Sequence, residues 1–234
     1  FLGSPFYRIE RFQEMVGVPL SDSKQWELVE ETGDAAFPVY QKLIKLGAQA
    51  DLIHNDDTHI RVLELMKENQ NNPELERKGM YTTGILAVKG DQQIALFFTG
   101  RQTAGENLDD VLQRRAEELD AIMHMADGSA ASRTKEVETL ESNCLTHGRR
   151  KFVEIYEAFP EACQKVIDDL ADVYQVDAFA KARQLTDEER LKLRQTWSKP
   201  IIDNLEVWLH QQLDDRIVEP NSSLGKAIKY CLKR

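Results

Sequence analysis

The hydrophobic pattern changes twice along this chain, and these changes limit what it can fold into. Residues 1–48 place apolar side chains at helical spacing, residues 49–152 mix alternating and helical stretches, and residues 153–234 are helical almost throughout. Alternation buries one face of a strand, whereas a helical period buries one stripe of a helix. We therefore predict an α/β core in residues 49–152 between two helical segments, with domain boundaries near residues 48 and 152.

Composition is that of a folded, soluble protein, with 41% hydrophobic and 30% charged residues among 234. Neither a run of about 18 apolar residues nor a signal-peptide pattern is visible, so we expect a cytoplasmic protein without a membrane span. The three cysteines are far apart and form no CxxC pair, which favours reduced thiols over disulfides or a zinc site. The net charge of −10 argues against non-specific coating of nucleic acid, although the last eleven residues carry four basic side chains and no acidic one.

The sequence predicts two helices separated by a break in residues 1–48. Gly17-Val18-Pro19 interrupts the first helix, and Ser21 or Ser23 can cap the second. This arrangement resembles a helix-turn-helix. A plain helical hairpin is the alternative, because the second helix begins with several acidic side chains that would repel DNA phosphates.

The middle segment contains predicted strands, one helix and one polar loop. Lys89-Gly90-Asp91-Gln92 is typical of a hairpin turn between two of the strands. Further on, Thr186-Asp187-Glu188-Glu189 is a capping box that opens a helix, and Pro200 should break or kink that helix. The predicted strands are 52–65, 84–88, 93–99 and 121–126, the helix is 107–119 and the loop is 68–78.

The first candidate for chemistry is His54-Asn55-Asp56-Asp57-Thr58-His59, which lies in a predicted strand. Side chains alternate along a strand, so His54 and Asp56 share one face, and Asp57 and His59 share the other. The face of Asp56 has apolar residues at both ends, and an ionised carboxylate on such a face needs a partner or a metal ion. The alternative is a solvated strand end with a turn-forming Asp-Asp pair.

The second candidate is Asp127, which follows the apolar strand 121–126. Ligand sites in α/β sheets lie beyond the carboxyl ends of strands, although Asp-Gly is also a common turn. Asp56 and Asp127 are 71 positions apart and would converge if their strands are neighbours. Converging carboxylates bind Mg²⁺, and two such ions can hold the attacking and leaving oxygens of phosphoryl transfer.

The third candidate is the stretch from Cys144 to Phe152, in which three consecutive cations follow a histidine. Arg149, Arg150 and Lys151, with His147, could hold phosphate groups. An ordinary basic start of a helix is the alternative.

Together these stretches resemble the insertion-sequence-sixty-six family of bacterial transposases, which have a DDE catalytic domain. The family's His-Ala-Asp-Glu-Thr is similar to residues 54–58, its Asp-Gly after a strand to residues 127–128, and its Cys-Trp-Ala-His-Ala-Arg-Arg-Lys-Phe to residues 144–152. Three further motifs occur in the same order. They are Gly-Val-x-Leu-Ser at 17–21, Arg-Ala-Gly-Glu at 103–106 and Ser-Pro-Leu-Gly-Lys-Ala-Ile-x-Tyr at 222–230.

The resemblance implies a ribonuclease H-like mixed sheet with flanking helices and a carboxy-terminal helical insertion. It implies that Asp56 and Asp127 are catalytic carboxylates that bind two Mg²⁺ or Mn²⁺ ions, and that the third, a glutamate, lies beyond Tyr230. The chain stops before that glutamate and starts inside the family sequence, so we expect it to be incomplete at both ends and inactive alone. Glu206 and Glu219, in the helical insertion, are weaker candidates for the third carboxylate.

The function implied is Mg²⁺-dependent DNA cleavage and strand transfer by a transposase of an insertion sequence in the bacterial cytoplasm. Its partners would be the transposon ends, the target DNA and a second copy in a homodimer. His147, Arg149, Arg150 and Lys151 would contact DNA, and the weaker candidates for this role are Lys192, Arg194, Lys226 and Lys229.

Two other functions stay open. A metal-dependent phosphoesterase would use His54, Asp56, Asp57 and His59, with zinc or manganese as the metal, although strand alternation separates the two histidines. The other is a transposase remnant without catalytic activity that binds DNA or nothing.

Overall fold

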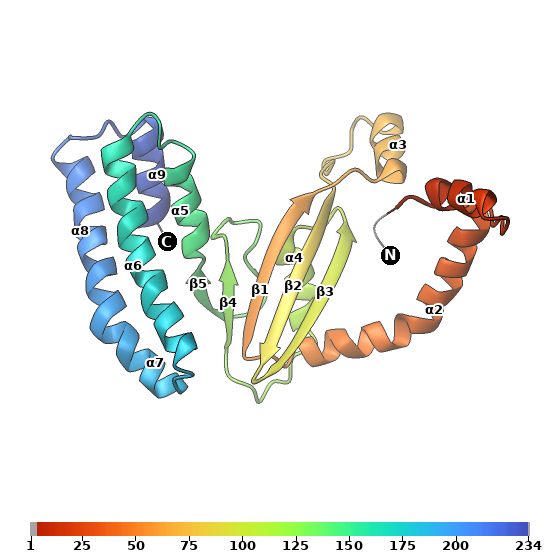
Figure 1. Cartoon of the computed structure of the whole chain (residues 1–234), viewed down its shortest axis with the longest axis horizontal. Coiled ribbons are helices and arrows are strands. Elements are labelled where there is room, and N and C mark those ends of the chain that lie inside the picture. Colours follow the sequence, from red (N-terminus) through yellow and green to blue (C-terminus); the bar gives the residue numbers. More distant parts are fainter. Residues whose placement is uncertain (1–3, 234) are drawn as a thin grey trace. The chain divides into compact units, whose positions relative to one another are not determined.

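A computed structural model describes residues 4–233, which form two compact units (Figure 1). The sheet unit runs to His124 and adds Ala131–Leu140, and the helical unit contains Met125–Ala130 and the chain from Glu141 onward. The extreme start, where no signal-peptide pattern is visible, and the last basic residue, Arg234, lie outside the described residues. Among residues 4–233, every helix is too short or too polar to span a lipid bilayer.

Five strands form one mixed sheet in the order β3-β2-β1-β4-β5, which confirms the predicted α/β class. β1 pairs antiparallel with β2, and β2 pairs antiparallel with β3 through a two-residue turn at Gly90 and Asp91. Gly90 has a φ of 55°, a conformation that hairpin turns require and that glycine adopts without strain. The strands are β1 (Leu52–His59), β2 (Tyr81–Lys89), β3 (Gln92–Gly100), β4 (Ile122–Ala126) and β5 (Thr139–Asn143).

Several predicted boundaries in the middle segment are wrong. The strand predicted at 52–65 ends at His59, where its partner β2 begins with Tyr81. The next residues form α3 (Leu63–Asn71), so the predicted loop starts only after Asn71, because Leu, Glu, Met and Lys are strong helix formers. The helix predicted at 107–119 is α4 (Ala104–Leu112), and β5 was not predicted.

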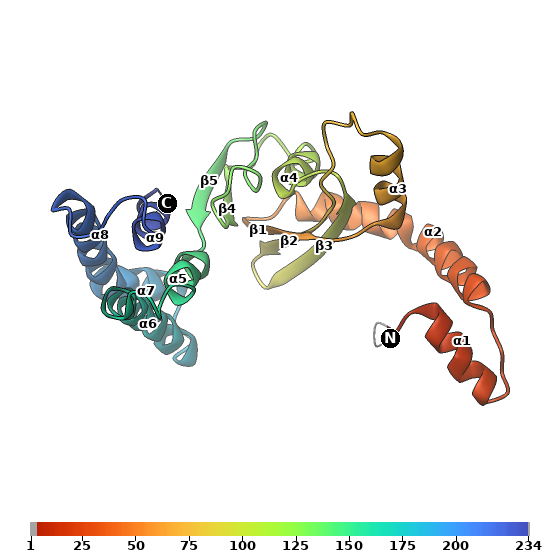
Figure 2. The same ribbon diagram turned by 90° about the horizontal axis from the view of Figure 1, so that it is seen from above.

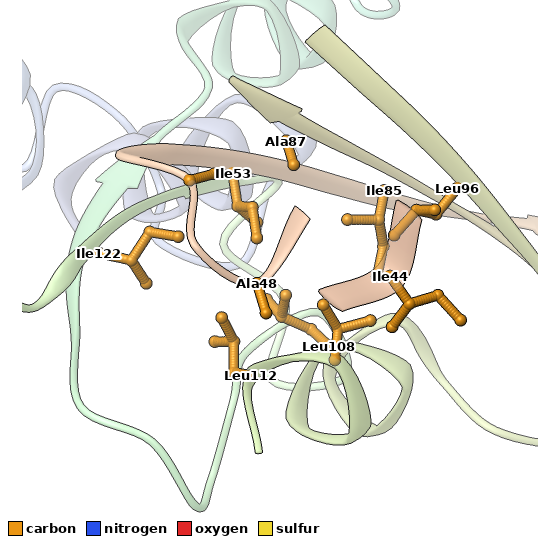
Figure 3. Close-up of a cluster of buried hydrophobic side chains, with 11 residues drawn as sticks. Ile44, Ala48, Ile53, Ile85, Ala87, Leu96, Leu108, Leu112 and Ile122 are labelled. Carbon is orange, nitrogen blue, oxygen red and sulfur yellow. The ribbon is translucent and has the colours of Figure 1, made fainter. Parts of the chain in front are cut away.

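The core of the sheet unit lies between one face of the strands and two helices. α4 contacts β1 and β2, and α2 (Asp22–Gly47) contacts β2 and β3 (Figure 2). Burial of these apolar side chains gives the unit its main stabilisation. Figure 3 shows side chains of this core, which are fully or almost fully buried: Ile44, Ala48, Ile53, Ile85, Ala87, Leu96, Leu108, Leu112 and Ile122.

The start of α4 is fixed by a carboxylate in its first turn. The Glu106 carboxylate accepts hydrogen bonds from the backbone N–H of Thr103, at 2.9 Å, and from the Thr103 hydroxyl, at 3.1 Å. The backbone hydrogen bond of Thr103 is the main cause that lowers the pKa of Glu106, and Arg77 contributes. Gly105, in the same turn, lies so close to the Arg133 carbonyl that a Cβ would collide with it.

Glu106→Gln should therefore destabilise the sheet unit by about 0.5–1 kcal/mol at pH 7, since a negative charge at a helix start is favourable. The folded-state pKa of Glu106 lies below the ordinary 4.5, so this stabilisation is present above that value and is lost as pH falls through the folded-state pKa. Denaturation of both proteins between pH 3 and pH 7 measures the difference. Glu117→Gln, at an exposed site, is the control, and a constant difference down to pH 3 would contradict the prediction.

The amino-terminal helices agree with the predicted helix–break–helix pattern. α1 (Phe6–Met15) and α2 are separated by the predicted break, and Ser21, rather than Ser23, caps α2 by accepting a hydrogen bond from Lys24 N–H at 3.2 Å. The Phe6 and Trp26 rings of the two helices make an edge-on contact.

The helical unit is built from four larger helices around a core that includes the buried side chains of Phe152, Cys163 and Ile228. The capping box at Thr186 and Glu189 is present, with Thr186 N–H donating to the Glu189 carboxylate at 2.8 Å. A π-helical turn precedes Pro200, which lies in the first turn of the next helix. The elements are α5 (Leu145–Val153), α6 (Pro160–Ala182), α7 (Asp187–Leu193), the π turn (Arg194–Ser198), α8 (Lys199–Asp214) and α9 (Ser223–Leu232).

Candidate catalytic site

Asp56 lies in β1 on the face of the sheet that the helices leave open. Its register partner in β2 is Gly84, which lacks a side chain, and Gly84 in turn pairs with Phe97 of β3, whose side chain is 66% exposed. One Asp56 carboxylate oxygen accepts the N–H of Asp57 at 2.9 Å. The Asp56 carboxylate is therefore accessible to a ligand from solvent.

Of the two interpretations of this strand, the exposure of Asp56 agrees with a solvated strand end and not with a carboxylate on a mostly apolar face in need of a partner. The buried face of β1 is the other one, with Ile53 and Asn55, because α4 packs against it. Asp56 is exposed, so water can solvate its charge. His54, two residues earlier on the open side, has a pKa lowered by burial and is neutral at pH 7, so it gives Asp56 no cationic partner.

Asp57 lies on the face toward α4 and has a structural role that the sequence analysis missed. Its carboxylate accepts the Thr83 hydroxyl at 2.5 Å and the backbone N–H of Ala104, the first residue of α4, at 2.7 Å. The carboxylate thus satisfies a donor at a helix start, where negative charge is favourable. The sequence signal that could have indicated this role is the position of Asp57 on the same strand face as the apolar Ile53.

Buried polar side chains around Asp57 were also missed. Asn55 donates to the Ser132 carbonyl at 2.8 Å, and its amide oxygen lies 2.8 Å from Nε2 of His124, which is only 2% exposed. Asn107 donates to the Thr83 hydroxyl at 2.8 Å. These contacts satisfy polar groups inside the core and join β1, β2, β4 and α4.

Asp127 directly follows β4, as predicted, and belongs to the helical unit. Its carboxylate accepts the N–H of Ser129 at 2.8 Å, and Gly128 between them has a φ of 75°. This is the turn geometry typical of Asp-Gly. The Asp127 carbonyl accepts the hydroxyl of Tyr230, in α9, at 2.8 Å, which ties the turn to the end of the chain.

A cluster of three or more metal-ligating side chains is not present among residues 4–233. The four side chains of the phosphoesterase alternative do not gather: Asp57 is engaged on the inner face, and the His59 ring lies 4.8 Å from the Tyr81 ring. Of the candidate carboxylates, Asp56 has the open surroundings that a ligand requires.

The predicted DNA-binding residues lie on α5. Arg149 is half-buried and Arg150 exposed, and neither forms an ion pair in the part of the chain that the structure describes. The Lys151 ammonium lies 3.9 Å from the Glu154 carboxylate and 5.5 Å from the ring centre of Tyr230. His147 is half-buried, and within the described range its Nδ1 has no hydrogen-bond partner. α5 thus carries two arginines free to meet a phosphate.

The comparison with protein families decides the class of this chain. The model of the Transposase IS66 family matches residues 2–234. The chain belongs to that family. Membership of a transposase family implies that the protein acts on DNA. It also implies a general dependence on a divalent metal ion. No curated protein matches the chain.

Proposed function

We propose that this IS66-family chain belongs to the catalytic domain of a DNA transposase, with Asp56 and Asp127 as catalytic carboxylates. The reaction would cut a DNA strand at the transposon end and join the freed 3′-hydroxyl to target DNA. Family membership and the open sheet face at Asp56 support the proposal together. The sheet would be ribonuclease H-like, and the mixed five-stranded order with flanking helices is consistent with this.

Asp56 and Asp127 would hold Mg²⁺ or Mn²⁺, and the fit lies in the chemistry of the donors. Carboxylate oxygens suit hard cations, and the Asp56 carboxylate is exposed with a single backbone hydrogen bond. When bound, such ions stabilise the attacking and leaving oxygens of phosphoryl transfer. Since no cluster of three or more metal-ligating side chains forms among the described residues, we expect the 234-residue chain assayed alone to be inactive or nearly so.

The chain's own residues would act by positioning. Arg149 and Arg150 on α5 would bind phosphates of the DNA backbone and so fix its register, with His147 and Lys151 beside them. Lys192, Arg194, Lys226 and Lys229 remain weaker candidates, and Arg194 is already paired with Asp177 at 2.8 Å. Positioning of this kind contributes much of the catalysis of phosphoryl transfer, which requires little covalent help from the protein.

The proposal places the protein in the bacterial cytoplasm, where its DNA partner is found, and includes a homodimer. Exposed apolar side chains on α1 and α2 provide a surface on which two copies could associate. They include Phe12, Trp26, Val29 and Phe37.

An assay of strand transfer tests the proposed function. The 234-residue chain and the longest protein that its gene encodes are incubated with labelled transposon-end DNA, a supercoiled target plasmid and Mg²⁺ or Mn²⁺. Joined products from the longer protein, lost with a chelator, support the proposal. If neither protein cuts or joins DNA but both bind it, the remnant alternative holds, and metal-dependent hydrolysis of small phosphate esters would favour the phosphoesterase.

DNA binding gives a separate prediction for α5. The double variant Arg149→Gln/Arg150→Gln should weaken binding of transposon-end DNA, because it removes phosphate contacts. Each lost contact should also reduce the steepness of the negative slope of log K against log salt by about 0.9. Binding is measured by fluorescence anisotropy between low and moderate salt. Lys181→Gln, at an exposed site on α6, is the matched control. An unchanged slope in the double variant would remove α5 from the DNA interface.

A further inference from the structure

A hollow on the surface of the helical unit is lined by neither carboxylate of the proposed catalysis. Its volume is about 710 Å³, and it lies where β5 leads into α5, against α6, the π turn and α8. This is within the size range of small-ligand sites. Its walls include Cys144, Thr146, Tyr174, Ser198 and Lys199.

One wall holds a buried hydroxyl without a partner. Ser198, the last residue of the π turn, is 8% exposed, and its Oγ has no hydrogen-bond partner among residues 4–233. A buried polar atom left in this state costs about 1–3 kcal/mol, so native proteins normally satisfy it. Single π turns are rare and occur often at functional sites.

A second wall contains the start of α5, where backbone N–H groups lack hydrogen-bond acceptors among the described residues. Its N-cap, Cys144, provides no side-chain hydrogen bond, and the N–H groups of Leu145 and Thr146 donate to no other group in the described part of the chain. A helix start carries a partial positive charge and unsatisfied N–H donors, which suit an anion. Both residues line the same hollow as Ser198.

Two positively charged side chains at the hollow form only weak ion pairs. Arg194 lies 2.8 Å from Asp177, and Lys199 lies 2.7 Å from Asp203, with the side chains of both pairs 44–63% exposed. Ion pairs this exposed contribute about 0–1 kcal/mol, so a bound anion can attract either cation away from its carboxylate.

From these groups we propose that the hollow binds a phosphate group. Ser198 Oγ and the N–H groups of Leu145 and Thr146 would donate to its oxygens, with Lys199 and Arg194 balancing its charge. The phosphate can come from a DNA backbone or from a free phosphate monoester, since both present the same oxygens. The site does not depend on Asp56 or Asp127, so it goes beyond the proposed strand transfer.

Calorimetric titration of the full chain tests the site with three probes: inorganic phosphate, thymidine 5′-monophosphate and a thymidine hexanucleotide without terminal phosphates. Thymidine alone is the negative control. We expect at least one phosphate probe to bind, and Ser198→Ala to weaken it about tenfold. Thr196→Val is the matched control, because its hydroxyl, in the same π turn, bonds the Lys192 carbonyl and does not line the hollow. Binding of the hexanucleotide alone identifies DNA as the source, and binding of inorganic phosphate or thymidine 5′-monophosphate alone identifies a free phosphate or phosphate monoester.

Cys144→Asp provides a second variant, which we expect to fold. An aspartate at the N-cap should satisfy an open N–H of α5 and raise the melting temperature, while its charge repels phosphate and weakens binding by more than about tenfold. The proposal is overturned if no phosphate probe binds at about 10 mM, or if Cys144→Asp binds as tightly as the natural chain. Failure of Asp56→Ala to affect strand transfer would leave this result unchanged, so the two proposals fail separately.

Discussion

Replacing Asp56 with alanine should reduce strand transfer by at least about a hundredfold and change the free energy of unfolding by less than about 0.5 kcal/mol. The first effect follows from the proposed loss of a metal-binding carboxylate. The second follows from the structure, since Asp56 is exposed, faces the side-chain-free Gly84 and accepts one hydrogen bond from its neighbour. Because the proposed catalytic carboxylate contributes almost nothing to the fold, its effects on activity and on stability can be measured separately.

Strand transfer by the longest protein that the gene encodes, with and without the change, measures the first effect. Thermal unfolding of the same proteins measures the second. Asp91→Ala, in the exposed turn between β2 and β3, is the control for loss of an acidic side chain from the sheet unit. If the Asp56→Ala protein remained fully active, the site assignment would be wrong.

Replacing the next residue, Asp57, should instead destabilise the fold. Asp57→Ala removes an acceptor from two buried donors, the Thr83 hydroxyl and the Ala104 N–H, and each unsatisfied donor costs about 1–3 kcal/mol. The change also removes a negative charge from the start of α4. We expect the sheet unit to lose about 3 kcal/mol of stability.

Amide hydrogen exchange measures this loss of stability separately in the sheet unit and in the helical unit. Amides of β1, β2 and α4 should exchange faster in the Asp57→Ala protein, whereas amides of α6 and α8 in the helical unit should keep their rates. Asp57→Asn keeps an acceptor oxygen and should recover part of the stability. Equal exchange of the sheet unit in the natural and Asp57→Ala proteins would show that the carboxylate does not hold α4 in place.

The two neighbouring aspartates illustrate what a sequence pattern can decide. Alternation placed Asp56 and Asp57 on opposite faces of β1, and the structure agrees. The pattern could not decide which face is buried, because each face carried apolar and polar residues. The helix α4 decides it by packing on the face of Ile53 and Asn55, so the sequence argument that placed Asp56 among apolar neighbours failed.

Local signals predicted local features well. The hairpin turn at Gly90, the strand before Asp127 and the capping box at Thr186 depend on residues close together in sequence, and all three are present. The end of β1 at His59 and the short strand β5 were missed, because a strand extends only as far as its partner in the sheet. Pairing of that kind is a long-range property.

The order of motifs along the chain by itself determined the family, since residue types at fixed spacing are a property of the sequence, and the match to the IS66 family confirms it. Only the tertiary structure decided that Asp56 faces solvent, that Asp57 holds the start of α4 and that Ser198 lies buried beside the open start of α5. Burial and hydrogen-bond satisfaction depend on which distant segments pack together, and the sequence pattern of a single segment does not contain that information.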